Sequence, residues 1–155
     1  DVYKRQTHAI EEANYIYFGN SNNLEDQNPR KYIKMNGRKI YNFALTNVPK
    51  AMKSCLEDSG YDIKDLKKIL IHQANEKMDE AIVKRFYGLY DMQAPQDIMP
   101  MTINTLGNSS VATVPTLYDL IINNKMEGHS INKGDLIMFA SVGAGMNINA
   151  MVYKA

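Results

Sequence analysis

A short apolar run that ends at a histidine constrains the fold of this chain more than any other feature. Ile69, Leu70 and Ile71 are followed directly by His72, a pattern typical of a parallel strand that is buried on both faces. Asn75 suits the N-cap of a helix that would end near Gly88. Its inward positions recur at helical spacing and are Met78, Ala81, Ile82 and Phe86. The sequence therefore predicts a buried strand followed by a helix, which is the unit of an α/β protein.

The same periodicity predicts two more helices. One runs from Ile40 to Ser59, ends at Gly60 and contains Pro49, which is expected to kink or divide it. The other follows the turn from Gly107 to Ser110, and Pro115 sets where it starts. Its expected inward positions are Val111, Val114, Tyr118, Ile121 and Ile122.

The remaining elements complete the predicted domain. A short strand is expected within Met99–Thr105, and a turn at Gly143–Gly145 would join the strands Leu136–Ala140 and Met146–Tyr153. The predicted fold class is therefore α/β, with layered helices on a mostly parallel mixed sheet that ends in an antiparallel hairpin.

The N-terminal residues add little to this prediction. Residues 1–6 resemble a translated sequencing adaptor, so they are set apart from the fold. Residues 7–32 are polar and rich in asparagine, and we interpret them as a connecting segment with one short aromatic strand at Tyr15–Phe18. The domain itself is expected to span residues 33–155.

Charge and hydropathy exclude several classes of protein. Eighteen Lys and Arg residues against 17 Asp and Glu give a net charge of +1, which argues against general nucleic-acid binding. The most apolar stretch, Leu136–Met146, is interrupted and shorter than the ~20 residues that a membrane span needs. The N-terminus has no signal-peptide core. We therefore expect a soluble, cytoplasmic protein with neither nucleic acid nor membrane as a partner.

Neither a nucleophilic cysteine nor a metal site is expected in this chain. Its single cysteine, Cys55, falls on the apolar face of the first predicted helix and is interpreted as a core residue. No metal-ligand spacing or phosphate-binding loop is present, so no metal and no cofactor are predicted.

Three turns are expected at strand ends, where α/β sheets carry their functional groups. They are residues 72–75, 107–110 and 141–145. His72 precedes a helix N-terminus, which favours the neutral ring; the alternative is a histidine buried and satisfied at a strand end. Asn108 is either a turn residue or an amide donor.

Held together, His72 and Asn108 would direct two neutral donors at one oxygen, which stabilises an enolate or an oxyanion. Gly143 and Ala144 would add a backbone N–H group, unless their turn is a plain hairpin.

Basic residues gather in two segments. Between Asn28 and Leu56 there are seven basic residues and no acidic residue, so this segment would attract an anionic partner. Lys77 and Lys84 share one face of the helix after His72, with Arg85 beside them. The alternative for that face is a solvated helix surface with a pair between Glu80 and Lys84.

These turns together resemble those of a known family. The chain resembles the C-terminal half of beta-ketoacyl-ACP synthase III, a thiolase-like condensing enzyme, over roughly residues 33–155. The matching motifs are Met35-Asn36-Gly37, His72-Gln73-Ala74-Asn75, Gly107-Asn108-Ser109-Ser110 followed by Pro115, Gly134-Asp135 and Gly143-Ala144-Gly145.

The resemblance implies a fold of two similar halves, with the active site between them and the nucleophilic cysteine in the other half. It implies fatty-acid biosynthesis by a decarboxylating Claisen condensation of acyl-CoA with malonyl-ACP, the enzyme being a homodimer when full length. His72 and Asn108 would stabilise the malonyl-derived enolate, and the turn at Gly143 and Ala144 would form the oxyanion hole. Lys77, Lys84 and Arg85 would dock the acyl carrier protein. This chain alone is expected to be inactive.

Two other functions remain open. One is a related thiolase-fold transferase with a different acceptor, such as a polyketide or quinolone-type synthase. The other is a non-catalytic partner subunit that keeps the fold and the dimer surface but has lost the cysteine.

Overall fold

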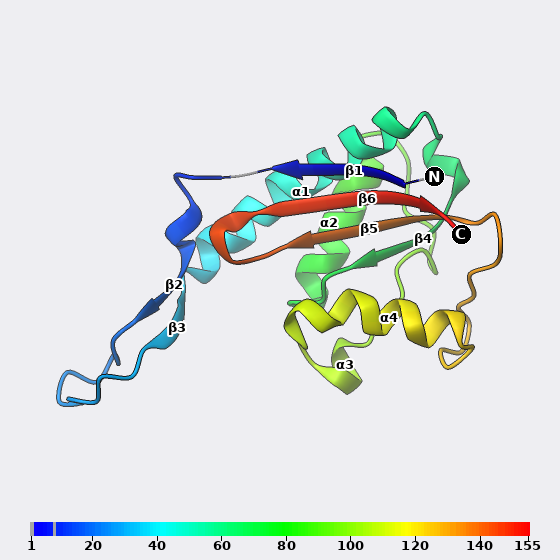
Figure 1. Cartoon of the computed structure of the whole chain (residues 1–155). Helices are drawn as coiled ribbons and strands as arrows, with labels where there is room; N and C mark the ends of the chain where they lie inside the picture. Colours follow the sequence, from blue (N-terminus) through cyan, green and yellow to red (C-terminus); the bar gives the residue numbers. More distant parts are fainter. Residues whose placement is uncertain (1, 8) are drawn as a thin grey trace.

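A mixed sheet forms the centre of the computed structural model, which describes residues 2–7 and 9–155 (Figure 1). Within these residues the sheet order is β1-β6-β5-β4. The strands are β1 (Val2–Thr7), β4 (Leu66–Ile71), β5 (Leu136–Val142) and β6 (Ile148–Lys154). β4 and β5 are parallel, whereas β6 is antiparallel to both of its neighbours. The predicted α/β class, with a mixed sheet and an antiparallel hairpin, is confirmed.

The edge strand β1 comes from residues that the sequence analysis set apart from the fold. It pairs with β6 along its whole length, from Val2 opposite Tyr153 to Thr7 opposite Ile148. Strand pairing is made by backbone groups, so the side chains of this segment gave no indication of it. The adaptor origin of residues 1–6 stays a prediction.

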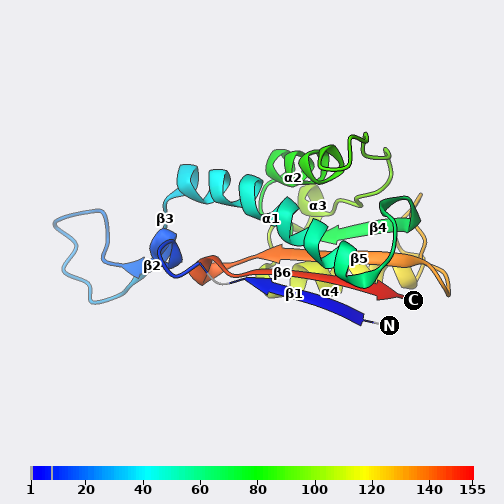
Figure 2. The ribbon, with the colours of Figure 1, turned by 90° about the horizontal axis from the view of Figure 1, so that it is seen from above.

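Helices cover both faces of the sheet (Figure 2). α1 (Gly37–Ser59) and α2 (Glu76–Gly88) lie together on one face. Alternate residues of β4, such as Ile69 and Ile71, point into the core beneath them. Cys55 of α1 lies in the same core and is 1% exposed, which confirms its predicted burial. No helix in the described part of the chain is long and apolar enough to cross a membrane.

α4 (Thr113–Ile122) covers part of the opposite face. Leu117 and Ile121 pack there against Leu70 and Ile137, forming a second and smaller core. The alternation of side chains along β4 and β5 thus divides their apolar residues between two helical layers.

α1 is continuous although Pro49 lies inside it. Because proline has no N–H group, the Leu45 carbonyl has no partner within the helix. Arg85 of α2 supplies the missing donor, with its Nη1 atom 3.1 Å from the Leu45 carbonyl oxygen. The predicted division of the helix at Pro49 is therefore wrong, since a neighbouring helix replaces the lost hydrogen bond.

Three predictions for α4 and the segment before it are also wrong. In place of a strand within Met99–Thr105, the structure has the one-turn helix α3 (Ile103–Leu106). Val111, predicted to face inward, is 91% exposed. It belongs to a separate 3-10 turn, η3 (Ser110–Ala112), so it does not follow the period of α4. Ile122, also predicted inward, is exposed at the end of α4.

The aromatic strand predicted near Tyr15–Phe18 is present one residue later, as β2 (Ile16–Gly19). It pairs with β3 (Tyr32–Met35), and the hairpin projects from the body of the molecule (Figure 1). Its apolar residues Phe18 and Ile33 lie opposite each other and remain largely exposed.

The contact between Arg85 and Leu45 can be tested with a double-mutant cycle. Arg85→Met leaves a carbonyl without a donor, so we expect it to lower the free energy of unfolding by about 1–2 kcal/mol. In a Pro49→Ala background the new backbone N–H can bond Leu45, and the cost should largely disappear. Urea denaturation measures both effects, with Lys84→Met as the control. An equal cost in both backgrounds would contradict the assignment.

Candidate active site

His72 stands at the carboxyl end of the parallel strand pair. Its backbone N–H continues the pairing of β4 with β5 by donating to the Ala140 carbonyl at 2.9 Å. β5 continues to Val142, so the turn that follows it begins a short distance beyond His72 at the same edge of the sheet. The structure thus places this histidine at the strand end where the sequence predicts it.

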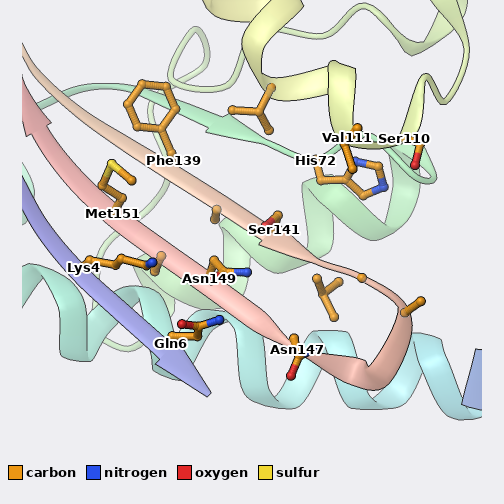
Figure 3. A pocket seen from close by; sticks show the side chains of 16 residues that line it. Lys4, Gln6, His72, Ser110, Val111, Phe139, Ser141, Asn147, Asn149 and Met151 are labelled. Atoms are coloured by element: carbon orange, nitrogen blue, oxygen red, sulfur yellow. The ribbon is translucent and has the colours of Figure 1, made fainter. Parts of the chain in front are cut away.

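His72 forms part of the wall of a pocket of about 610 Å³ (Figure 3). The pocket lies on the α4 side of the sheet, over strands β1, β5 and β6. Figure 3 shows the His72 ring beside Val111 and Ser110, with Ser141 on the neighbouring strand. The described residues include no group of three or more His, Cys, Asp or Glu side chains suited to a metal ion.

Burial keeps the His72 ring neutral. The side chain is half-buried, and the loss of hydration lowers the pKa of His72 below its ordinary value. The dipole of the following helix was predicted to lower the pKa of His72 as well, but burial is the cause in the structure. A neutral ring carries one N–H donor and one acceptor nitrogen.

Asn108 follows α3 and Gly107, whose φ of 64° lets the chain reverse. Its Oδ1 atom accepts a hydrogen bond from the Ser110 N–H at 2.9 Å, so the turn role left open by the sequence is present. The same bond assigns the oxygen to the turn and leaves the Nδ2 amide as the donor for a ligand.

The Asn108 side chain is exposed and lies outside the pocket lining, whereas Ser110 and Val111 are part of that lining. The end of the Asn108 turn therefore lies in the same pocket as His72. That the His72 and Asn108 side chains act together on one oxygen stays a prediction.

Of the two residues predicted to supply a backbone N–H group, Gly143 has a partner within its own turn. The Gly143 N–H donates to the Asn147 carbonyl at 3.1 Å. Ala144 is the first residue of a short 3-10 turn, η4 (Ala144–Met146), and the first N–H groups of a helix have no partner within it. Ala144 is therefore the better placed of the pair to serve a ligand. Both residues line the pocket.

Ser110 is a pocket residue that sequence reasoning did not single out. Its φ is 56°, a left-handed conformation that is uncommon for a residue with a side chain. Such strain persists only where surrounding contacts hold it, and it gathers at functional sites. The motif Asn-Ser-Ser after a glycine was the available signal, but it predicts a turn rather than this particular residue.

The predicted docking residues lie on the outer surface of α2. Lys77, Lys84 and Arg85 are all exposed. Lys84 and Arg85 line a groove between α1 and α2 together with Lys50, a member of the basic segment before Leu56. No ion pair joins Glu80 to Lys84 within the described residues. The fold thus combines parts of the two basic segments on one surface.

Asp79 is buried in the first turns of α2, close to the loop that carries His72. It is fully inaccessible, and neither carboxylate oxygen has a hydrogen-bond partner among the described residues. Burial raises the pKa of Asp79 to about 7, and the nearby backbone N–H groups of Asn75 and Ala74, which do not reach hydrogen-bonding geometry, oppose this shift only in part. Sequence reasoning missed this residue, because an acid in a first helical turn is usually a solvated one.

Comparisons with known proteins agree on one family. The sequence model described as 3-oxoacyl-[acyl-carrier-protein (ACP)] synthase III C terminal matches residues 56–155. Beta-ketoacyl-[acyl-carrier-protein] synthase III of Levilactobacillus brevis is 29% identical over 123 residues, which are 79% of this chain and 35% of that protein. The Porphyra umbilicalis protein of the same name is 34% identical over 79% of this chain and 34% of its own length. The chain thus spans about a third of these relatives.

Solved structures show the same fold. The 3-oxoacyl-[acyl-carrier-protein] synthase III of Aquifex aeolicus superposes with a TM-score of 0.78 at 21% identity, covering 99% of this chain and 44% of that one. The priming beta-ketosynthase of the R1128 polyketide pathway has a TM-score of 0.80 at 20% identity, with coverages of 99% and 44%.

Asp79 should make stability depend on pH. Because its folded pKa is raised, the unfolded chain releases this proton first, so the free energy of unfolding falls between about pH 4 and pH 7. We expect Asp79→Asn to raise the unfolding free energy by about 4 kcal/mol at pH 8 and to change it little at pH 4. Urea denaturation at both pH values measures this. Glu127→Gln, an exposed carboxyl, is the control, and a gain of equal size at pH 4 would refute the account.

Proposed function

Because the chain belongs to the 3-oxoacyl-ACP synthase III family and matches its C-terminal part, we propose that it supplies the enolate-stabilising side of a condensing active site. The reaction is the decarboxylating Claisen condensation of acyl-CoA with malonyl-ACP in fatty-acid biosynthesis. The observation that carries the proposal is the position of His72. Its neutral ring lies at a strand end, in one pocket with the turn of Ala144 and the end of the Asn108 turn.

The chemistry follows from the donors. When the malonyl thioester loses CO2, the electron pair of the broken C–C bond moves into the thioester and gives an enolate. The His72 ring N–H and the Asn108 Nδ2 amide donate hydrogen bonds to the enolate oxygen. The α-carbon of the enolate then attacks the acyl thioester. The carbonyl oxygen of that thioester becomes an oxyanion, which the Ala144 N–H stabilises. Collapse of that intermediate expels the thiolate that carried the acyl group.

The nucleophile of this reaction lies elsewhere. Cys55 is buried in the core beneath α1 and α2, whereas the pocket lies on the α4 face. We propose that the thiol that carries the acyl group belongs to the other half of the enzyme and that this chain alone is inactive, and the burial of Cys55 supports this. In our proposal the complete enzyme is a cytoplasmic homodimer that uses acyl-CoA and acyl carrier protein and needs no cofactor.

The acyl carrier protein docks on the basic surface of α2 in this proposal. Lys77 and Lys84 are exposed there, and Lys50 joins Lys84 in the groove beside α1. An acidic carrier would be attracted to this positive field. Arg85 has a second task, because its guanidinium also satisfies the Leu45 carbonyl. The likeness to a polyketide ketosynthase concerns the fold alone, so it does not favour a different acceptor.

The donor assignment can be tested in the full-length enzyme. We expect His72→Ala and Asn108→Ala each to slow malonyl-ACP decarboxylation by about a hundredfold, the effect of removing one oxyanion donor. Release of CO2 from labelled malonyl-ACP measures the rate. His129→Ala, a histidine outside the pocket, should leave the rate unchanged. Full activity in either donor variant would refute the assignment.

Carrier docking gives a separate prediction. Charge reversal by Lys77→Glu or Lys84→Glu should lower kcat/KM for malonyl-ACP by about tenfold at low salt and flatten its salt dependence. Lys50→Glu should act in the same way because Lys50 shares the groove with Lys84. Acyl-CoA kinetics should not change. Lys125→Glu, beyond α4, is the control, and an equal loss in that variant would show a general charge effect in place of docking on α2.

A further inference from the structure

Gln73 follows His72 in the sequence, yet it points away from solvent and outside the pocket lining. Its side chain is 0% exposed, and every polar group of the carboxamide is engaged by one segment far along the chain. Nε2 donates to the Pro100 carbonyl at 2.9 Å. Oε1 accepts from the Thr102 N–H at 2.7 Å and from the Thr102 hydroxyl at 3.0 Å.

Thr102 connects this contact to the turn that bears Asn108. It is the N-cap of α3, and its carbonyl accepts hydrogen bonds from the N–H groups of Thr105 and Leu106 at 3.0 and 2.8 Å. The helix ends at Gly107, whose N–H bonds the Ile103 carbonyl at 3.0 Å. Asn108 is the next residue. One compact, internally bonded turn therefore separates the Gln73 contact from Asn108.

His72 does not depend on this contact. Its backbone is held by the hydrogen bond to Ala140, which continues the sheet. The segment after α2 has another connection to β4, through the Ile69 N–H and the Ile98 carbonyl at 2.8 Å, but this lies before Pro100. Among the hydrogen bonds of the described residues, those of Gln73 are therefore the nearest to Asn108 that join its segment to the end of β4.

We propose that Gln73 is a positioning residue, whose carboxamide holds the turn bearing Asn108 at its working distance from His72. The inference rests on the function proposed above, in which the two side chains serve one oxygen. A buried amide costs free energy unless it is hydrogen-bonded. The hydrogen bonds of the Gln73 carboxamide all go to one segment, at Pro100 and Thr102. Because Gln73 is inaccessible, it acts through that segment and not on the substrate. Displacing a catalytic group by about 1 Å can cost a hundredfold in rate.

The test compares Gln73→Met in two backgrounds of the full-length enzyme. Methionine keeps the volume but loses the three hydrogen bonds. In the otherwise unchanged enzyme, kcat for malonyl-ACP decarboxylation should fall at least tenfold, with KM changed less than about twofold. In an Asn108→Ala background the same substitution should change kcat less than about twofold, because the group it positions is already absent. Thr102→Val, which removes only the hydroxyl contact, is the matched control and should cost less than threefold.

Gln73→Glu keeps the proposal testable where the methionine variant does not fold. A protonated glutamic acid can accept from Thr102 and donate to Pro100 in the same way, whereas the ionised form cannot donate. Its kcat relative to the unmodified enzyme should therefore be high at low pH and fall as the pH rises.

Equal losses in both backgrounds, or a pH-independent kcat ratio for Gln73→Glu, would overturn the positioning role. The proposed function would survive that result if His72→Ala and Asn108→Ala still slow decarboxylation by about a hundredfold. If those two variants keep full activity, the function itself fails.

Discussion

The parallel pairing of β4 with β5 determines where the site can form, because it sets two strand ends side by side. The register places Ile71 opposite Ala140, and the His72 N–H extends it by one more bond to the same residue. In a parallel pair the carboxyl ends meet at one edge, so His72 and the turn holding Ala144 lie together. A shift of one residue would turn the His72 side chain to the opposite face of the sheet, away from the pocket.

In the helical layer above the parallel strands, one buried polar group has a hydrogen-bond partner from a neighbouring helix and another has none among the described residues. Pro49 frees a carbonyl inside α1, and Arg85 of α2 bonds it, so the two helices are joined by a polar contact as well as by their apolar faces. Asp79 has no such partner among the described residues, and its burial favours the protonated form. Arg85 thus supports the fold while it also lines the groove between α1 and α2.

The two donor segments reach the pocket by different routes. His72 is placed by the sheet, through its backbone hydrogen bond to Ala140. Asn108 is placed by the turn after α3, and the residues just before α3 are hydrogen-bonded to the end of β4 through the buried amide of Gln73. The proposed reaction needs both donors at one oxygen, so the accuracy of the site depends on this side-chain contact. The pocket wall made by Ser110 belongs to the same turn.

Local sequence patterns were enough to predict the class of the fold, the strand and helix around His72, the terminal hairpin and the burial of Cys55. These follow from local patterns, since hydrophobic period and capping residues act over a few positions. Three features could be seen only in the folded chain. α1 continues through Pro49, residues 2–7 form an edge strand, and buried polar groups such as the Leu45 carbonyl and the Gln73 amide find their hydrogen-bond partners. Such outcomes depend on partners distant in sequence, as Gln73 and Thr102 are, and a local pattern carries no information about them.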